Sequence, residues 1–261
     1  TMAFAITAQK LKIKVAHVEA GIRSDDWTMP EEINRMVTDS ISNYFFTTSE
    51  NANQNLKNSG ISDDRIFFVG NTMIDTLLGN MKRFCKPTFW EELKLSEGNY
   101  FVLTLHRPDN VDETKKFIQM LEVVSKGSRG LPVVYPVHPR AAKNLTELSG
   151  FAPNIQFVDP QPYLEFNFLV RNSKAVITDS GGITEEATVM GIPCMTLRNS
   201  TERPETISLG TNELVGIVPD NLLPYLNTLF EGKWKKGKVP PLWDGYAGER
   251  IVSHLEEILF C

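Results

Sequence analysis

The chain has 261 residues, a length that suits one large domain or two domains of ordinary size. Its 41% hydrophobic and 23% charged residues are close to the globular average, which excludes disordered, collagen-like and coiled-coil proteins. The net charge of -5 argues against a nucleic-acid-binding surface, and no apolar run approaches the roughly 18 residues of a membrane span. Three cysteines without C-x-x-C spacing fit a reduced cytoplasmic protein that holds no structural zinc.

Short β-branched or aromatic runs alternate with amphipathic stretches along the first third of the chain, as in parallel βα units. Pro30 suits the first position of a helix, and the acidic residues Glu31 and Glu32 after it favour the helix dipole. Ser49 is the expected N-cap of a helix that Gly60 ends. The other elements expected here are helices over 1–10, 30–41 and 72–85, and strands over 13–18, 44–47 and 66–69.

A second series of elements follows a break at Lys86-Pro87. Its expected strands are 100–105, 132–137, 155–158, 175–178, 194–197 and 214–218, and its helices are 113–125, 163–171, 182–190 and 250–259. The pattern predicts an α/β protein of two doubly wound, Rossmann-like domains. We assign residues 1–85 to the first domain, completed by the terminal helix 246–261, and residues 86–245 to the second.

The first domain is expected to be incomplete at its N-terminus. A doubly wound domain normally opens with a strand and a ligand-binding turn, whereas this chain opens on a helix. Only about three strands precede Cys85, which is few for an independent sheet.

Polar residues gather where the predicted strands end, the edge at which open parallel sheets bind ligands. His17 and Glu19 end the first strand, and His106 and His138 follow two strands of the second series. The sequence Asp-Ser-Gly-Gly (179–182) follows a third strand of that series. Partly buried structural histidines and ordinary loops are the alternative interpretation.

Ser180, Gly181 and Gly182 precede a helix and form a candidate phosphate cradle, because glycines and free helix N–H groups accommodate an anion. The alternative is a tight turn with Ser180 as N-cap. Glu186, one turn further on, suits ribose hydroxyls. Arg203 offers a fork of donors to the same anion, or is a surface arginine without a partner.

Glu19 and Glu31 form a second candidate constellation, with Arg23 between them. Paired carboxylates near a histidine can divide the roles of acid and base when their environments separate their pKa values. Compensation of the helix dipole is the alternative role of Glu31. No metal-ligand spacing is present in the sequence.

Six blocks of the sequence together resemble the non-hydrolysing UDP-N-acetylglucosamine 2-epimerases. They occur in that family's order, cover nearly the whole chain, and differ from the hydrolysing relatives in the first two blocks. The blocks are HVEAGIRS (17–24), PEEINR (30–35), GNTMID (70–75), LTLHR (103–107), TDSGGITEEA (178–187), and TERPE (201–205) with GTN (210–212).

The resemblance implies a glycosyltransferase-B-like fold that binds UDP in a cleft and interconverts UDP-GlcNAc and UDP-ManNAc for cell-surface polysaccharide synthesis. UDP is eliminated with the C2 proton, and the 2-acetamidoglucal intermediate takes UDP back with the opposite configuration, without a redox cofactor or metal. The residues that match catalytic positions of the family are Glu19, Glu31 and His106. Those that match its substrate-binding positions are Arg23, His138, Gln161, Phe166, Ser180, Gly181, Gly182, Glu186 and Arg203. UDP is therefore expected to bind mainly through the second half of the chain.

The family has further strands and another catalytic aspartate upstream of the stretch that matches Thr1, so the chain as given is expected to bind UDP without turnover. An epimerase of a related UDP-diacetamido sugar and a non-catalytic UDP-sugar-binding protein are the alternatives; the upstream reading frame would discriminate between an active parent enzyme and a binding protein. The expected partners are the UDP-sugar and a second copy of the chain in a homodimer, and neither nucleic acid nor a membrane.

Overall fold

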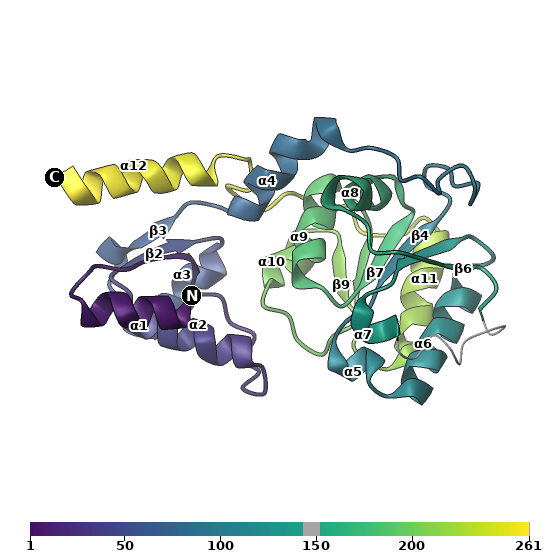
Figure 1. Cartoon of the computed structure of the whole chain (residues 1–261), viewed down its shortest axis with the longest axis horizontal. Helices are drawn as coiled ribbons and strands as arrows, with labels where there is room; N and C mark the ends of the chain where they lie inside the picture. Colours follow the sequence, from purple (N-terminus) through teal and green to yellow (C-terminus); the bar gives the residue numbers. More distant parts are fainter. Residues whose placement is uncertain (143–151, 261) are drawn as a thin grey trace. The chain divides into compact units, whose positions relative to one another are not determined.

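The computed structural model describes residues 1–142 and 152–260. The chain divides into two compact units, each of which contains a parallel β-sheet (Figure 1). Unit 1 comprises Thr1–Gly79, Ser200–Glu205 and Pro240–Cys261, and unit 2 comprises Asn80–Asn199 and Thr206–Val239. Cys261, the last residue of the terminal helix expected over 246–261, lies outside the described residues. No helix of the described chain is long and apolar enough to cross a bilayer.

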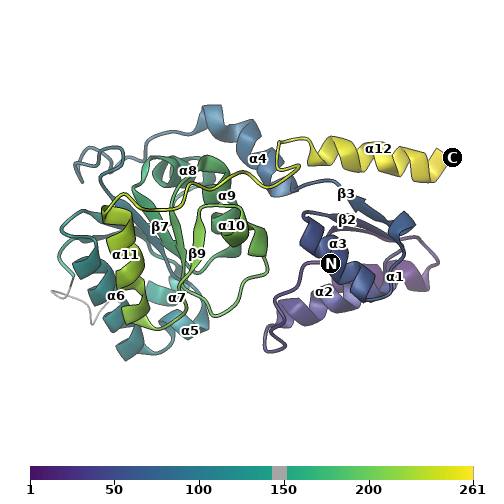
Figure 2. The same ribbon diagram turned by 180° about the vertical axis from the view of Figure 1, so that it is seen from behind.

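Unit 1 is built on a three-stranded parallel sheet in the order β1-β2-β3, in agreement with the predicted strand count. The strand expected at 13–18 as buried begins three residues later and lies at the sheet edge, where Val18 is 40% exposed. In both views α1 and α2 run side by side (Figures 1 and 2). Its elements are α1 (Met2–Lys10), β1 (Ala16–Ala20), α2 (Pro30–Ile41), β2 (Tyr44–Thr47), α3 (Glu50–Asn58), η1 (Asp63–Arg65), β3 (Ile66–Phe68), α4 (Thr72–Asn80) and α12 (Ala247–Phe260).

Local signals set the helix starts of unit 1 as the sequence predicts. Pro30 takes the first position of α2, and the hydroxyl of Ser49 accepts a hydrogen bond from the Ala52 N–H at the start of α3. The start of α12 depends instead on a tertiary contact, because the carboxylate of Asp75 accepts the N–H groups of its first two residues at 3.1 and 2.7 Å. This cap fits a start of α12 at Ala247, within the predicted terminal segment 246–261 and three residues before the narrower helical pattern at 250–259.

Unit 2 contains a six-stranded, all-parallel sheet in the order β6-β5-β4-β7-β8-β9. This is the doubly wound order in which the chain reverses direction beside the first strand, so the ligand-binding crevice is expected where β4 and β7 end. The elements of unit 2 are η2 (Met81–Arg83), β4 (Phe101–Thr104), α5 (Pro108–Val111), α6 (Thr114–Gly127), β5 (Val133–Pro136), α7 (Pro139–Ala142), β6 (Ile155–Val158), α8 (Tyr163–Asn172), β7 (Ala175–Thr178), α9 (Gly181–Met190), β8 (Cys194–Thr196), β9 (Asn212–Leu214), η4 (Pro219–Asn221) and α11 (Leu222–Phe230). The helix α10 (Pro204–Ser208) has its first two residues in unit 1 and its last three in unit 2.

Helices cover both faces of the unit 2 sheet because successive strand residues point to opposite sides. On one face, Phe101, Val133 and Ile177 pack against the buried side chains of α6 and α11. On the other face, Val102 and Val176 pack against α8, α9 and the loop before β4. Figure 2 shows α6 and α11 together on the first of these faces. The strand interior is therefore apolar in continuous runs, and polar groups of the strands are left for their ends.

One predicted strand of unit 2 is displaced, one predicted helix ends later than expected, and the helices α5, α7 and α11 were not predicted. The strand expected at 214–218 lies at Asn212–Leu214, paired with β8, and Gly216 with φ +89° follows it. The helix expected to end at 125 continues through Gly127. The whole of α11 was absent from the sequence prediction.

Candidate functional site

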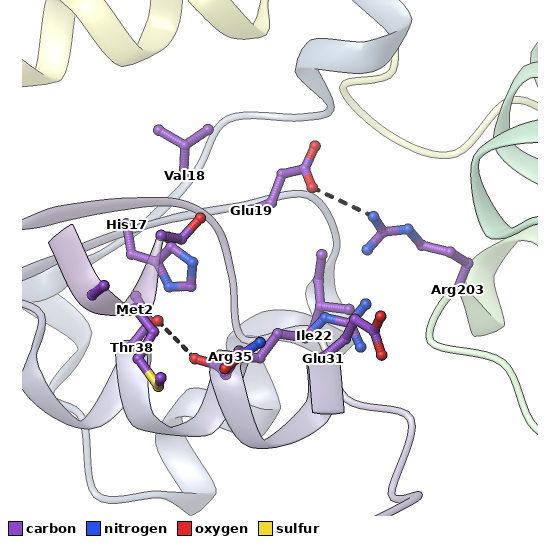
Figure 3. A pocket seen from close by; sticks show the side chains of 12 residues that line it. Met2, His17, Val18, Glu19, Ile22, Glu31, Arg35, Thr38 and Arg203 are labelled. Carbon is purple, nitrogen blue, oxygen red and sulfur yellow. Dashed lines mark hydrogen bonds and ion pairs between the residues drawn. The ribbon is translucent and has the colours of Figure 1, made fainter. Parts of the chain in front are cut away.

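A cavity of about 510 Å³ opens in unit 1 where β1 ends and α2 begins (Figure 3). Two of the residues matched to catalytic positions, Glu19 and Glu31, line it together with Arg203, so the fold brings these three predicted site residues to one place. The other lining residues are Thr1, Met2, Ala3, His17, Val18, Ile22, Asn34, Arg35 and Thr38. Apart from the first three residues, Val18 and Ile22, the wall is polar or charged.

Glu19 is positioned by an irregular end of β1. The register of β1 on β2 shifts between Val18 and Ala20, and Glu19 between them has φ +63°, a conformation that costs a non-glycine residue energy. Gly21 follows with φ +77°, and a Cβ there would overlap the carbonyl oxygen of Ala52. The strained turn directs the Glu19 carboxylate toward Arg203, whose Nη2 lies 3.6 Å from Oε2 (Figure 3). Strain of this kind is commonly retained where a side chain must be aimed at a ligand.

The adjacent residues Glu31 and Glu32 have different roles at the start of α2. Glu32 is 1% exposed and closes the preceding loop, because its carboxylate accepts the Ser24 N–H at 3.0 Å and the Asp25 N–H at 3.2 Å. Glu31 is exposed and lines the cavity. The carboxylate available for chemistry in this pair is therefore Glu31, as the sequence match proposed, while Glu32 stabilises the loop that holds it.

Asp39, which the sequence analysis did not identify, is a buried carboxylate that joins His17 of the cavity wall to Arg23 behind it. Asp39 of α2 accepts hydrogen bonds from His17 Nδ1 at 2.6 Å and from the Gly21 N–H at 3.2 Å, and it forms an ion pair with Arg23 Nη1 at 2.6 Å. Arg23, which was expected to bind substrate, is thus engaged with Asp39 and with the carbonyl of Ile22. Its place in the structure is behind the lining of the cavity rather than in it.

A second cavity, of about 350 Å³, lies in unit 2 at the carboxyl ends of the strands, where the reversal of strand order predicts a ligand site. Five of the predicted site residues line it: His106, His138, Gln161, Phe166 and Ser180. The rings of the two histidines lie 5.6 Å apart between centroids. Residues from four separate strand-end segments therefore meet in one crevice, as expected from their positions after strands.

Asp179 is a buried carboxylate that holds the residues at the end of β4 in place. Its fully buried carboxylate accepts the backbone N–H groups of His106 and Arg107 at 3.0 and 2.9 Å, and the amide of Asn110 at 3.0 Å. His106 Nδ1 lies 2.7 Å from the other carboxylate oxygen. Burial opposes ionisation, but the hydrogen bonds from His106, Arg107 and Asn110 outweigh it and hold the pKa of Asp179 below its ordinary value. An ionised Asp179 fixes the Nδ1–H tautomer of His106 and leaves Nε2 for a ligand.

The start of α9 keeps its backbone donors available. Ser180 is the N-cap, yet its side chain makes no capping hydrogen bond, so the alternative of a Ser-capped turn is not what the structure contains. The first N–H groups of α9, at Gly181 and Gly182, have the arrangement that binds anions. Glu186, one turn further on, accepts a hydrogen bond from the Tyr163 hydroxyl at 2.9 Å, and burial raises its pKa.

No group of three or more His, Cys, Asp or Glu side chains suited to a metal ion occurs among the described residues. The chemistry that the two cavities offer is therefore that of carboxylates, histidines and arginines.

A model of the UDP-N-acetylglucosamine 2-epimerase family matches residues 1–256. The chain is 41% identical over 272 residues to the UDP-N-acetylglucosamine 2-epimerase of Methanocaldococcus jannaschii, with 97% of this chain and 72% of that protein covered. The chain belongs to the UDP-N-acetylglucosamine 2-epimerase family. The resemblance inferred from the six sequence blocks is confirmed.

The solved structure of the M. jannaschii epimerase in complex with UDP-GlcNAc and UDP matches 98% of this chain and 72% of that one, with a TM-score of 0.84. This match confirms the predicted α/β fold of two Rossmann-like domains in the glycosyltransferase-B-like class. A second relative, 36% identical over 262 residues, is the UDP-2,3-diacetamido-2,3-dideoxy-D-glucuronate 2-epimerase of Pseudomonas aeruginosa, with 99% of this chain and 72% of that protein covered.

In this member of the epimerase family, the residues that were not predicted as site residues are partners of the predicted ones; of these, only Asp179 was noted in the sequence, as a polar residue at a strand end. Asp39 and Asp179 each contact a histidine that lines a cavity, and the Tyr163 hydroxyl donates to the predicted site residue Glu186. Asp179 had a signal, since it directly follows a strand, whereas Asp39 lies inside a helix and Tyr163 begins one.

Proposed function

We propose that the protein catalyses the interconversion of UDP-N-acetylglucosamine and UDP-N-acetylmannosamine. The observation that carries the proposal is the unit 1 cavity, in which two carboxylates, Glu19 and Glu31, lie with the cation Arg203 beside one of them. The M. jannaschii relative bears the name of this activity, and its solved structure contains UDP-GlcNAc and UDP, which supports the choice of substrate.

The reaction requires a base for the C2 proton and help for a departing diphosphate. A carboxylate takes the proton, the C2–H electron pair forms the C1=C2 bond, and the C1–O bond breaks with its electron pair leaving on UDP. Addition of UDP to C1 and of a proton to the opposite face of C2 completes the inversion. Substrate and product are epimers of the same oxidation state, so the reaction needs no oxidant or reductant and hence no redox cofactor. We assign the acid and base roles to the pair Glu19 and Glu31 without dividing them.

Unit 2 supplies the nucleotide-binding groups in this proposal. The N–H groups at the start of α9 suit the diphosphate, and Glu186 suits the ribose hydroxyls. His106, held by Asp179 through Nδ1, presents Nε2 to the cavity and assists the leaving phosphate. Arg203 is assigned to the same diphosphate, and its ion pair with Glu19 supports a role beside the reacting carbons.

The direct test is incubation of UDP-GlcNAc in D2O with the protein expressed from its complete reading frame, followed by anomeric NMR. We expect UDP-ManNAc to form with deuterium at C2, because the proton removed by the carboxylate exchanges with solvent before re-addition. Glu19→Gln and Glu31→Gln should each abolish most of the conversion, whereas Glu91→Gln, at an exposed ion pair of unit 2, should not. Conversion without deuterium at C2, or none with the wild type, contradicts the proposal.

The P. aeruginosa relative makes a UDP-diacetamido-glucuronate the second candidate substrate. Arg35, which lines the unit 1 cavity as a second cation besides Arg203, suits a uronate carboxylate. The same NMR assay with both UDP-sugars as competing substrates decides between them through the ratio of kcat/KM values.

Two variants test the assignment of the nucleotide site. Arg203→Ala should weaken UDP binding by about 1.5–3 kcal/mol, the usual contribution of a hydrogen bond to a charged group, as measured by calorimetry. His106→Ala should lower kcat more than it raises KM, since its interaction is made chiefly in the transition state. Unchanged UDP affinity or unchanged kcat, respectively, removes that residue from the site.

The proposal includes a homodimer in the cytoplasm. The large apolar side chains Phe4 and Leu11 of unit 1 are 79% and 66% exposed, which supports a contact with another copy, and the free thiols of Cys85 and Cys194 fit a reducing compartment. Sedimentation at several concentrations measures the mass, and a monomer at all of them contradicts the dimer.

A further inference from the structure

His17 is a buried histidine with one ring nitrogen committed and the other facing a cavity. Its side chain is 9% exposed, and Nδ1 lies 2.6 Å from the carboxylate of Asp39. The residue also lines the unit 1 cavity, where Figure 3 places its ring on the wall below Glu19. Among residues 1–142 and 152–260, no hydrogen-bond partner of His17 Nε2 is present.

The surroundings of Asp39 determine what Nε2 can do. Arg23 lies 2.6 Å from the Asp39 carboxylate, which is 4% exposed, so a cation already balances its charge. When the Asp39 carboxylate accepts the Nδ1–H of His17, this tautomer leaves a lone pair on Nε2. Nε2 is thus a hydrogen-bond acceptor fixed in direction by a buried second residue. Nε2 is not among the fully buried polar atoms, so water can reach it from the cavity, and a donor on a ligand would replace that water.

The composition of the cavity indicates which part of a UDP-sugar carries that donor. No tryptophan, tyrosine or phenylalanine lines it, so it lacks the aromatic surfaces on which a base would stack. Its polar wall of carboxylates, arginines, an asparagine and a threonine instead suits a ring that carries several hydroxyls and an acetamido group.

We propose that His17 Nε2 accepts a hydrogen bond from an O–H or N–H donor of the amino-sugar ring and positions that ring against Glu19 and Glu31. His17 is then a positioning residue for the sugar, and Asp39 with Arg23 sets its tautomer and orientation. The inference rests on the proposed function, because it takes the sugar of a UDP-sugar as the ligand. The inference extends the proposed function because it assigns sugar recognition to His17, a residue other than the two carboxylates Glu19 and Glu31.

Two substitutions separate the roles of the two ring nitrogens. His17→Asn retains a donor near the position of Nδ1, so Asp39 keeps its bond, but it removes the acceptor at Nε2. His17→Gln places an amide near the position of Nε2 and gives up the Nδ1 donor. We expect His17→Asn to weaken UDP-GlcNAc binding about three- to tenfold, the usual effect of one neutral hydrogen bond, and to leave UDP binding unchanged. His17→Gln should recover part of the UDP-GlcNAc affinity, as measured by calorimetry.

Imidazole ¹⁵N NMR of the wild type tests the same proposal without a substitution at the site. The chain has four histidines, so single variants of the other three assign the spectrum. We expect His17 to be protonated on Nδ1, and its Nε2 resonance to move on addition of UDP-GlcNAc but not of UDP. An Nε2–H tautomer, or equal responses to the two ligands, overturns the inference even if the variants do not fold.

The outcomes also distinguish this inference from the proposed function. If the wild type neither binds nor converts UDP-GlcNAc, the proposed function fails. If the wild type converts UDP-GlcNAc and His17→Asn matches it in sugar affinity, kcat and KM, the role of His17 alone is refuted.

Discussion

The substitution Asp179→Asn tests the most heavily used side chain of unit 2. One oxygen of the buried carboxylate accepts three N–H groups, from His106, Arg107 and Asn110, at 2.9–3.0 Å. The other oxygen accepts His106 Nδ1 at 2.7 Å. An asparagine that keeps its oxygen toward the three donors must present its NH2 group to Nδ1, which inverts the tautomer of His106.

The expected loss of stability follows from the change of acceptor. Each of the three donors exchanges an ionised acceptor, a bond of about 1.5–3 kcal/mol, for a neutral one of about 0.5–1.5 kcal/mol. The loss is therefore about 1 kcal/mol per donor, and about 3 kcal/mol for the three, since no solvent reaches this fully buried group to compensate. The inverted tautomer should also lower kcat, because Nε2 of His106 then carries the proton in the resting enzyme.

Urea unfolding followed by the fluorescence of Trp90, which lies in the core of unit 2, measures the change. Asp112→Asn is the matched control in the same unit, because Asp112 and its partner Arg140 are about half exposed and such pairs contribute about 0.2–1 kcal/mol. Equal effects of the two substitutions would refute the role assigned to Asp179.

The pH dependence gives a second check on the same carboxylate. Its folded pKa is lowered, so its contribution is complete above the unfolded pKa of about 3.9 and is lost as the pH falls through the folded pKa. The difference in unfolding free energy between wild type and Asp179→Asn should therefore be constant from pH 7 to about pH 5 and shrink only in more acidic solution. A difference that already shrinks between pH 7 and 6 would contradict this assignment.

Three further substitutions probe other contacts of the two units. Gly21→Ala should lower the free energy of unfolding of unit 1 by about 2–4 kcal/mol in urea, because the added Cβ meets the backbone of α3 and the residue has a positive φ. Gly60→Ala is the control: it has the same kind of φ but open space around the added Cβ, and it should lower that free energy by about 1–2 kcal/mol. Asp75→Ala should cost about 1 kcal/mol and speed amide exchange at the start of α12; normal protection there would refute the cap. Tyr163→Phe should raise the pKa of Glu186 further, since the Tyr163 hydroxyl now lowers it, and a ¹³C carboxyl titration that shows a fall would contradict this cause.

Sequence patterns predict the elements whose causes are local. The strands β6 and β7 begin and end where their apolar runs do, and Pro30 and Ser49 start their helices as expected. The helix α11 was missed because Pro224 in LLPYLNTLF suggests a break, although a proline in the first turn leaves a helix intact. The short strand β9 is stabilised by its pairing with β8 rather than by a hydrophobic run, and that pairing has no local signal.

The candidate site divides in the same way. Residues that end strands could be found, because the ends of parallel strands meet at one edge whatever the details of packing. That the segment 200–205 belongs to unit 1 could not be predicted, because it depends on contacts with residues far away in the chain, such as the ion pair of Arg203 with Glu19. The sequence expectation therefore grouped Arg203 with the second domain.

The two histidine–aspartate pairs show what else the sequence leaves undetermined. His17 and Asp39 are 22 residues apart, and His106 and Asp179 are 73 apart, yet each histidine bonds through Nδ1 to a buried carboxylate. Asp39 is balanced by Arg23, whereas backbone and amide N–H groups surround Asp179. The Nε2 atom of a histidine at a strand end can donate or accept a hydrogen bond, and the aspartate bonded to Nδ1 determines which of the two it does. The chemistry offered to a ligand is therefore set by a residue that neither spacing nor periodicity reveals.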